Sequence, residues 1–160
     1  LPVLFLCENN QYAMGTALSR HQAQTILTKK AESYSLPADR ADGMDVRSVQ
    51  QAVAKACGYV RDGKGPYFLE LLTYRFRAHS MFDPDLYRDK QEVEEWKKRD
   101  PIVFHRDRLF AEGRIEKADL AALEREAEQE IDDAIAFAEA GTEEPVADLE
   151  KFLYSVGRPA

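Results

Sequence analysis

Two short apolar runs separated by an amphipathic stretch constrain the fold of this chain most strongly. The first run, Val3 to Cys7, ends in the turn formers Glu8-Asn9-Asn10, which is typical of a strand covered on both faces of a parallel sheet. Between the runs, residues 46–60 place apolar side chains at three- and four-residue steps, and Asp45 can cap the helix that this spacing predicts. The second run is Tyr67 to Leu72. The order strand, helix, strand predicts an α/β fold with a parallel sheet.

The other elements are predicted less directly. Residues 11–21 lack periodicity and predict a loop, residues 22–34 a helix, and residues 38–41 a short strand. After Arg88 the pattern becomes helical over residues 89–98, 101–112 and 117–140, and the tail at 145–156 keeps apolar residues at helical spacing.

Composition excludes several classes of protein. The net charge of −7 argues against nucleic acid as the main partner, and no apolar run approaches the roughly 20 residues needed to cross a membrane. Cys7 and Cys57 lie in apolar segments and are interpreted as reduced core thiols of an intracellular protein. Residues 1–80 carry a net charge of +3 and residues 81–160 a net charge of −10, so two different surfaces are expected.

The segment after the first strand can supply oxygen ligands. Mg²⁺ prefers such ligands in octahedral array, and an Asn side chain with a main-chain carbonyl two residues later provides two of them. Asn10 and Tyr12 have this spacing. The alternative is that the Asn9-Asn10 pair only terminates the strand.

The segment after the second strand is basic. Arg75, Arg77 and His79 lie within five residues, and such a cluster complements a diphosphate. His79 could donate a hydrogen bond to a phosphate oxygen or move a proton near neutral pH. The alternative is a solvated loop whose arginines pair with the acidic second half. His21 and His105 are isolated, and neither Gly-x-Gly-x-x-Gly nor a complete P-loop occurs in the sequence.

The chain resembles the α subunit of the E1 component of 2-oxoacid dehydrogenase complexes, in the pyruvate and acetoin dehydrogenase branch. Several motifs carry the resemblance, and they follow one another in the order found in that family. They are Glu8-Asn9-Asn10-Gln11-Tyr12-Ala13-Met14-Gly15-Thr16, Asp42-Gly43-Met44-Asp45, Gly63-Lys64-Gly65-Pro66, Thr73-Tyr74-Arg75, His79-Ser80-Met81, Asp83-Pro84, Tyr87-Arg88 and Arg99-Asp100-Pro101-Ile102. The resemblance implies a thiamine diphosphate-binding fold. Residues 1–88 would be the later part of that α/β domain, with an active-site loop at 74–88, and residues 89–160 a helical carboxyl-terminal extension.

The resemblance also implies the cofactors. The family binds thiamine diphosphate through Mg²⁺, and its motif begins with Gly-Asp-Gly and ends with the Asn-Asn pair. Asn10 would then give its side-chain oxygen and Tyr12 its main-chain oxygen to the metal. The Gly-Asp-Gly half is expected upstream of Leu1, so the chain is interpreted as the later part of a larger subunit.

In the loop, His79 matches a histidine that reaches the cofactor diphosphate and assists acyl transfer to lipoamide. Arg75 matches an arginine that orders the loop and belongs to the cofactor site. Ser80 matches a serine that a kinase phosphorylates in mitochondrial relatives, and a phosphate there would disorder the loop. The loop is one residue shorter than the mitochondrial one and lacks its second serine, which favours a bacterial enzyme in which Ser80 is structural.

The family implies an oxidoreductase that decarboxylates pyruvate, or cleaves acetoin, and passes the acyl group to lipoamide. Its partners would be an E1 β subunit in an α₂β₂ heterotetramer, a lipoyl-bearing E2 acyltransferase and a small 2-oxoacid, and neither nucleic acid nor membrane. The protein would be cytoplasmic in a bacterium or lie in the mitochondrial matrix of a eukaryote. The alternatives are a branched-chain 2-oxoacid homologue and a non-catalytic module that retains the fold. The 160 residues alone are expected to be inactive.

Overall fold

The chain is described by a computed structural model that covers residues 1–151 and 153. Its residues divide into two compact units, one over Leu1–Glu112 and the other from Gly113 onward. The functional segments predicted above all lie in the first unit. The expected domain boundary after Arg88 remains a prediction.

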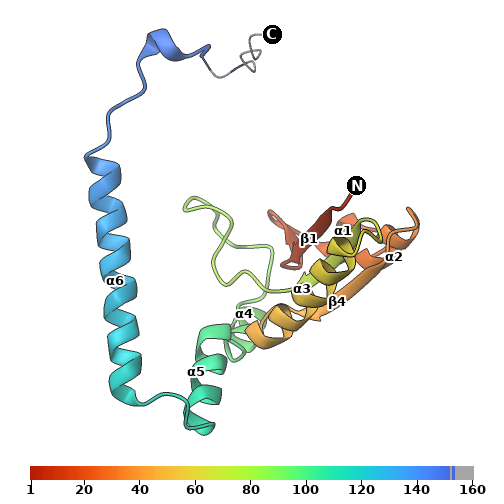
Figure 1. The fold of residues 1–160 in the computed structure, drawn as a ribbon, viewed down its shortest axis with the longest axis horizontal. Helices are drawn as coiled ribbons and strands as arrows, with labels where there is room; N and C mark the ends of the chain where they lie inside the picture. Colours follow the sequence, from red (N-terminus) through yellow and green to blue (C-terminus); the bar gives the residue numbers. More distant parts are fainter. Residues whose placement is uncertain (152, 154–160) are drawn as a thin grey trace. The chain divides into compact units, whose positions relative to one another are not determined.

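A three-stranded parallel sheet forms the centre of the first unit (Figure 1). Its order is β1 (Leu4–Asn9), β5 (Tyr67–Leu72) and β4 (Ala38–Asp42), so β5 is the central strand. The register aligns Asn9, Leu72 and Asp42, the last residues of the three strands. The predicted α/β class and the parallel pairing are therefore confirmed.

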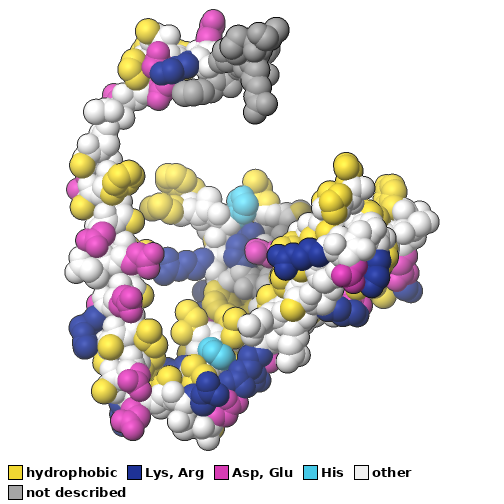
Figure 2. Space-filling view, in the orientation of Figure 1, with side chains coloured by type: hydrophobic (Ala, Val, Ile, Leu, Met, Phe, Trp, Pro, Cys, Tyr) yellow, Lys and Arg dark blue, Asp and Glu magenta, His cyan; other side chains and the backbone are white. Residues whose placement is uncertain are grey.

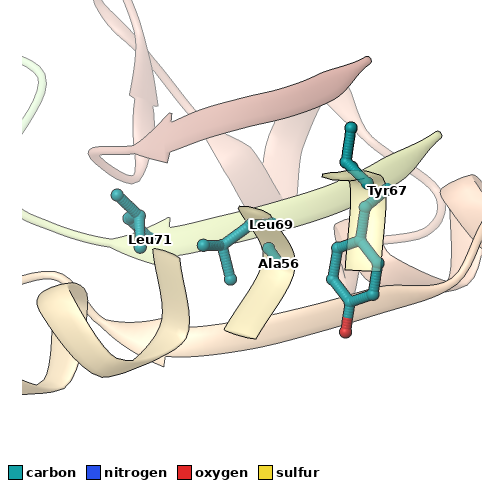
Figure 3. Close-up of a cluster of buried hydrophobic side chains, with 5 residues drawn as sticks. Ala56, Tyr67, Leu69 and Leu71 are labelled. Atoms are coloured by element: carbon teal, nitrogen blue, oxygen red, sulfur yellow. The ribbon is translucent and has the colours of Figure 1, made fainter. Parts of the chain in front are cut away.

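Helix α3 (Val46–Arg61) covers one face of the sheet. Asp45 caps it as predicted, because its side chain accepts a hydrogen bond from the Arg47 amide at 3.0 Å. The core joins Ala56 and Val60 of this helix to Tyr67, Leu69 and Leu71 of β5. Figure 3 shows Leu69 and Leu71 projecting from β5 beside Ala56 of the helix. The strand, helix, strand pattern thus supplies the main core of this unit.

Strand β1 differs from the prediction of a strand covered on both faces. Phe5 is 48% exposed and Leu6 54% exposed. The strand lies at the edge of the sheet and pairs with β5 alone, so its side chains have few neighbours. Cys7 and Cys57 are free thiols as predicted, although both are half-buried rather than fully buried.

The segment from residue 11 to 36 also differs from the prediction. The expected loop contains a small antiparallel pair, β2 (Tyr12–Ala13) with β3 (Thr16–Ala17), and one helical turn, α1 (Leu18–His21). Helix α2 spans only Leu27–Glu32. The Gln24 side chain accepts a hydrogen bond from the Ile26 amide at 3.0 Å. This local bond holds an extended backbone at the point where a longer helix would have to begin.

Helices α4 (Lys90–Lys97) and α5 (Pro101–Ala111) follow as expected. Pro101 occupies the first turn of α5, where a missing amide hydrogen is tolerated. Two ion pairs attach α5 and the residue pair before it to the end of β4 and the turn that follows. They join Arg99 to Asp42 at 2.5 Å and Arg108 to Asp45 at 3.0 Å.

The second unit consists of α6 (Lys117–Glu139) and a short 3₁₀ helix, η1 (Val146–Asp148). Figure 2 shows acidic and hydrophobic side chains along α6. The helical tail predicted at 145–156 is confirmed only over η1, and Phe152 and residues 154–156 lie outside the described residues. Among the described residues, no helix combines the length and the apolar character that a membrane crossing requires.

Candidate functional site

The carboxyl ends of the three strands meet at one edge of the sheet, which is where ligands bind in open parallel sheets. The main chain joins these ends directly. The Thr73 amide donates to the Asn9 carbonyl, and the Gly43 amide donates to the Leu72 carbonyl, both at 2.9 Å. The two segments singled out in the sequence, 8–16 and 73–88, therefore begin side by side.

The turn after β1 is built from two successive Asx turns. The side-chain oxygen of Asn9 accepts from the Gln11 amide, and that of Asn10 accepts from the Tyr12 amide, both at 3.1 Å. Gln11 adopts a positive φ of 72° within this turn. Asn10 and Tyr12, the two predicted metal-binding residues, are thereby held in one turn. A carboxamide oxygen has two lone pairs, so the Asn10 oxygen can still accept a second partner.

Gly43 marks a close approach in the neighbouring turn. A Cβ atom at this position would lie 2.4 Å from Cγ2 of Thr73 and 2.9 Å from the Leu72 carbonyl oxygen. No side chain fits there without displacing β5. The glycine therefore lets the end of β4 and the end of β5 lie against each other.

A cavity of about 410 Å³ opens at this edge. It is lined by residues from the ends of all three strands and from the start of α5: Glu8, Asn10, Gly43, Met44, Thr73, Tyr74, Arg75, Phe76 and Pro101. The sequence prediction that Asn10 and Arg75 belong to one site thus corresponds to a shared cavity wall. Tyr12 does not line this cavity.

Arg75 connects the loop at 74–88 to the turn after β1. Its Nη2 atom donates to the main-chain oxygen of Met14 at 2.8 Å and to the Tyr87 hydroxyl at 3.1 Å. Its Nε atom donates to the Arg77 carbonyl at 3.1 Å. Most of the guanidinium donors are therefore used within the protein, and what remains for a ligand is chiefly the positive charge.

The loop is closed on itself by two further groups. The Arg88 side chain is 1% exposed, forms an ion pair with Asp85 at 2.6 Å and donates to the carbonyls of Arg75 and Phe76. The Asp83 carboxylate accepts from the amides of Asp85 and His79 and from the Tyr87 hydroxyl, at 2.7–3.0 Å. The Asp85 amide, the Tyr87 hydroxyl and the His79 amide together hold the pKa of Asp83 below its usual value.

His79 is exposed on this loop, and its ring contacts Arg75. The distance from Nδ1 to the Arg75 Nη1 atom is 3.3 Å. Arginine can only donate, so this contact requires the lone pair of Nδ1 and leaves the hydrogen of the neutral ring on Nε2. Ser80, beside it, is also exposed.

Aromatic rings lie between the turn and the loop. Tyr74 stacks on Trp96 of α4 with a centroid distance of 5.1 Å, and Tyr12 contacts the rings of both Tyr74 and Tyr87. Burial, with the Glu92 carboxylate nearby, raises the pKa of Tyr74 to about 12. Trp96 is thus a packing residue of α4.

The sequence did not identify Asn9 and Glu70 as a pair. Asn9 is 7% exposed and Glu70 fully buried, and the Asn9 amide nitrogen donates to the Glu70 carboxylate at 2.7 Å. The available signal was a single charged residue inside the otherwise apolar run from Tyr67 to Leu72. Such a residue needs a partner when the strand is buried.

Comparison with known proteins now identifies the family. The model described as "Dehydrogenase E1 component" matches residues 1–147. The chain belongs to the dehydrogenase E1 component family. The family resemblance found in the sequence is therefore confirmed, and the residues of this E1 chain can be compared with named relatives.

Several curated relatives of this E1 chain are named pyruvate dehydrogenase E1 component subunit alpha. The Rhizobium meliloti protein is 42% identical over 150 residues, which cover 93% of this chain and 43% of the relative. The somatic mitochondrial form of Homo sapiens is 40% identical over 161 residues, which cover 99% of this chain and 41% of the relative. The Rickettsia conorii protein is 40% identical over 139 residues, covering 87% and 43%. The chain thus spans about two fifths of the length of these relatives.

Proposed function

We propose that this chain supplies one wall of the Mg²⁺–thiamine diphosphate site of a pyruvate dehydrogenase E1 α subunit. The observation that carries the proposal is a cavity at the carboxyl edge that is lined by Asn10 from one segment and Arg75 from the other. Relatives of about 40% identity that are named as this subunit support the same assignment.

The donor set fits the metal. The Asn10 side-chain oxygen and the Tyr12 main-chain oxygen are hard, neutral ligands of the kind that Mg²⁺ binds together with phosphate and water. The Asx turn fixes the Asn10 side chain before any ligand arrives, since its oxygen already accepts from the Tyr12 amide. In this role Asn10 and Tyr12 hold the metal and do not react themselves.

The loop residues would act on the diphosphate and on the acyl group. When bound, thiamine diphosphate supplies the carbanion chemistry that decarboxylates a 2-oxoacid. Arg75 supplies positive charge beside the diphosphate and fixes the loop through Met14 and Tyr87. His79 presents its Nε2 hydrogen to a phosphate oxygen and assists acyl transfer to lipoamide. Ser80 is a candidate regulatory position, because a phosphate there would place negative charge next to a diphosphate.

The complete enzyme would be an α₂β₂ heterotetramer with an E1 β subunit, and it would pass the acyl group to a lipoyl-bearing E2 acyltransferase. Pyruvate is the proposed substrate, while acetoin and branched-chain 2-oxoacids are the alternatives. The relatives include bacterial and mitochondrial proteins, so we assign the bacterial cytoplasm or the mitochondrial matrix. The isolated 160 residues would not turn over substrate.

The test uses the complete α chain co-expressed with its β chain. Wild-type enzyme should oxidise pyruvate in the presence of lipoamide, and acetoin and branched-chain acids serve as comparison substrates. Asn10→Ala should weaken thiamine diphosphate binding by about tenfold or more at limiting Mg²⁺. His79→Ala should slow lipoamide acylation more than it changes cofactor affinity. Unchanged cofactor affinity in the Asn10 variant would overturn the metal assignment.

A further inference from the structure

Glu70 is an unusual residue for the centre of a sheet. It lies on β5, the middle strand, its side chain is 0% exposed, and it is the one charged residue among the six of that strand. Removing a carboxylate from water costs several kcal/mol unless paired groups compensate. The contacts of Glu70 therefore indicate what its charge is for.

Both neighbouring strands contribute a partner to Glu70. Arg40 is its register partner on β4, and its guanidinium binds the carboxylate with two hydrogen bonds, at 2.8 and 3.1 Å. On the other side, β1 places the buried Asn9 so that its Nδ2 atom donates to Oε1 of Glu70 at 2.7 Å. The carboxylate thus joins an exposed arginine to a buried asparagine across the sheet.

The bond to Glu70 decides how the Asn9 carboxamide is oriented. With its nitrogen directed at the carboxylate, its oxygen accepts from the Gln11 amide at 3.1 Å. Gln11 adopts its positive φ in this position. The next residues form the second Asx turn, in which Asn10 accepts from the Tyr12 amide. A rotated Asn9 carboxamide would present hydrogen atoms to the Gln11 amide and destabilise the turn.

We propose that Glu70 is a positioning residue for the metal site, which acts through Asn9 to hold the turn that carries Asn10 and Tyr12. Arg40 balances the charge of Glu70 without taking part in the turn. The inference rests on the proposed function, since it assigns a role to Glu70 only if Asn10 binds the metal.

A contribution to stability alone does not account for this arrangement. Exchanging a buried ion pair for apolar side chains of similar volume is often neutral or stabilising. Leu69 and Leu71, the neighbours of Glu70, are buried against α3 on the opposite face of the same strand. The carboxylate provides what leucine cannot, which is an acceptor that fixes the Asn9 carboxamide in one of its two orientations.

The experiment measures Mn²⁺ binding in the presence of thiamine diphosphate, by the loss of the free Mn²⁺ signal in electron paramagnetic resonance. The protein is the complete α chain with its β chain. Glu70→Leu should weaken Mn²⁺ binding by about tenfold. This is the lower end of the loss in metal affinity that is typical when a residue supporting a metal ligand is replaced. Glu70→Gln keeps an acceptor for Asn9, and should restore affinity to within about threefold of wild type.

Leu69→Ala is the matched control, because Leu69 is equally buried and adjacent on the same strand, while its side chain packs in the core with α3. It should lower the unfolding temperature without changing Mn²⁺ affinity. An equal loss of affinity in Leu69→Ala, or wild-type affinity in Glu70→Leu, would overturn the inference.

Asn9→Ala gives an independent route if the Glu70→Leu enzyme fails to assemble. It leaves the pair of Arg40 and Glu70 in place and should reproduce the loss of affinity. Asn10→Ala distinguishes a failure of the proposed metal site from a failure of the positioning role of Glu70. If Asn10→Ala binds Mn²⁺ normally, the metal assignment itself is wrong. If Asn10→Ala weakens binding while Asn9→Ala and Glu70→Leu do not, only the role of Glu70 is refuted.

Discussion

Arg75 donates a hydrogen bond to the main-chain oxygen of Met14 across 61 positions of the chain, at a distance of 2.8 Å. This bond joins the loop after β5 to the turn after β1, and the Tyr87 hydroxyl receives a second bond from the same nitrogen. The loop is thus attached to the proposed metal turn by the protein itself.

Removing the Arg75 side chain should release the loop. In Arg75→Met we expect trypsin to cleave after the exposed Arg77 several times faster than in wild type, as followed by mass spectrometry of the products. Arg61→Met, at the exposed end of α3, is the matched control and should leave this cleavage unchanged. Equal cleavage rates in the Arg75 variant and wild type would mean that other bonds suffice to hold the loop.

Asp83 should make loop order depend on pH. Its pKa is lowered in the folded protein, so the stabilisation is present above the ordinary pKa of the carboxyl and is lost as the pH falls through the lowered value. At pH 7, Asp83→Asn should increase amide hydrogen exchange in residues 74–88. The difference from wild type should shrink at lower pH, when Asp83 itself is protonated. A difference that stays constant with pH would contradict the assigned role of the charge.

Replacing glycine by alanine should have opposite effects on stability at Gly43 and at Gly58. Gly43→Ala places a Cβ within 2.4 Å of Thr73 and should cost about 1–3 kcal/mol of unfolding free energy. Gly58→Ala lies within α3, has open space around the new Cβ, and should stabilise by about 0.4–1 kcal/mol. Urea unfolding of both variants measures the two values. A neutral Gly43→Ala would show that the ends of β4 and β5 can separate without cost.

The contribution of Tyr74 to the unfolding free energy should decrease in the alkaline range. Because its pKa rises from 10.0 to about 12 on folding, the contribution is complete below pH 10 and declines as the pH rises toward 12. Comparison of unfolding for wild type and Tyr74→Phe between pH 9 and 12 isolates this effect. The difference in unfolding free energy between wild type and Tyr74→Phe should narrow or change sign as the pH increases. A difference that does not depend on pH would argue against the raised pKa.

Much of the sheet was predictable because its signals are local. The apolar steps of residues 46–60 and the apolar run at 67–72 each identify an element without knowledge of its neighbours, and Asp45 caps the helix as expected. Helix α2 is shorter than predicted, and just before it the Ile26 amide donates a hydrogen bond to the Gln24 side chain, which favours an extended backbone there. Periodicity does not reveal such a bond.

The grouping of residues at the candidate site was predictable only in part. Asn10 and Arg75 were identified by residue type and by their position after strands, and they share a cavity. The sequence did not single out Glu70, because one charged residue does not change the prediction of an apolar strand. The role of Glu70 depends on the partners that the strands on either side supply. That order, β1-β5-β4, is a property of the tertiary fold rather than of any segment.

Two ion pairs, from Arg99 just before α5 to Asp42 and from Arg108 of α5 to Asp45, end on the same four-residue turn that contains Gly43 and Met44. Those two residues form part of the cavity wall. The outer face of α5 exposes Ile102, Val103 and Phe104. A molecule bound to these three side chains would therefore contact the helix whose first residue, Pro101, lines the cavity.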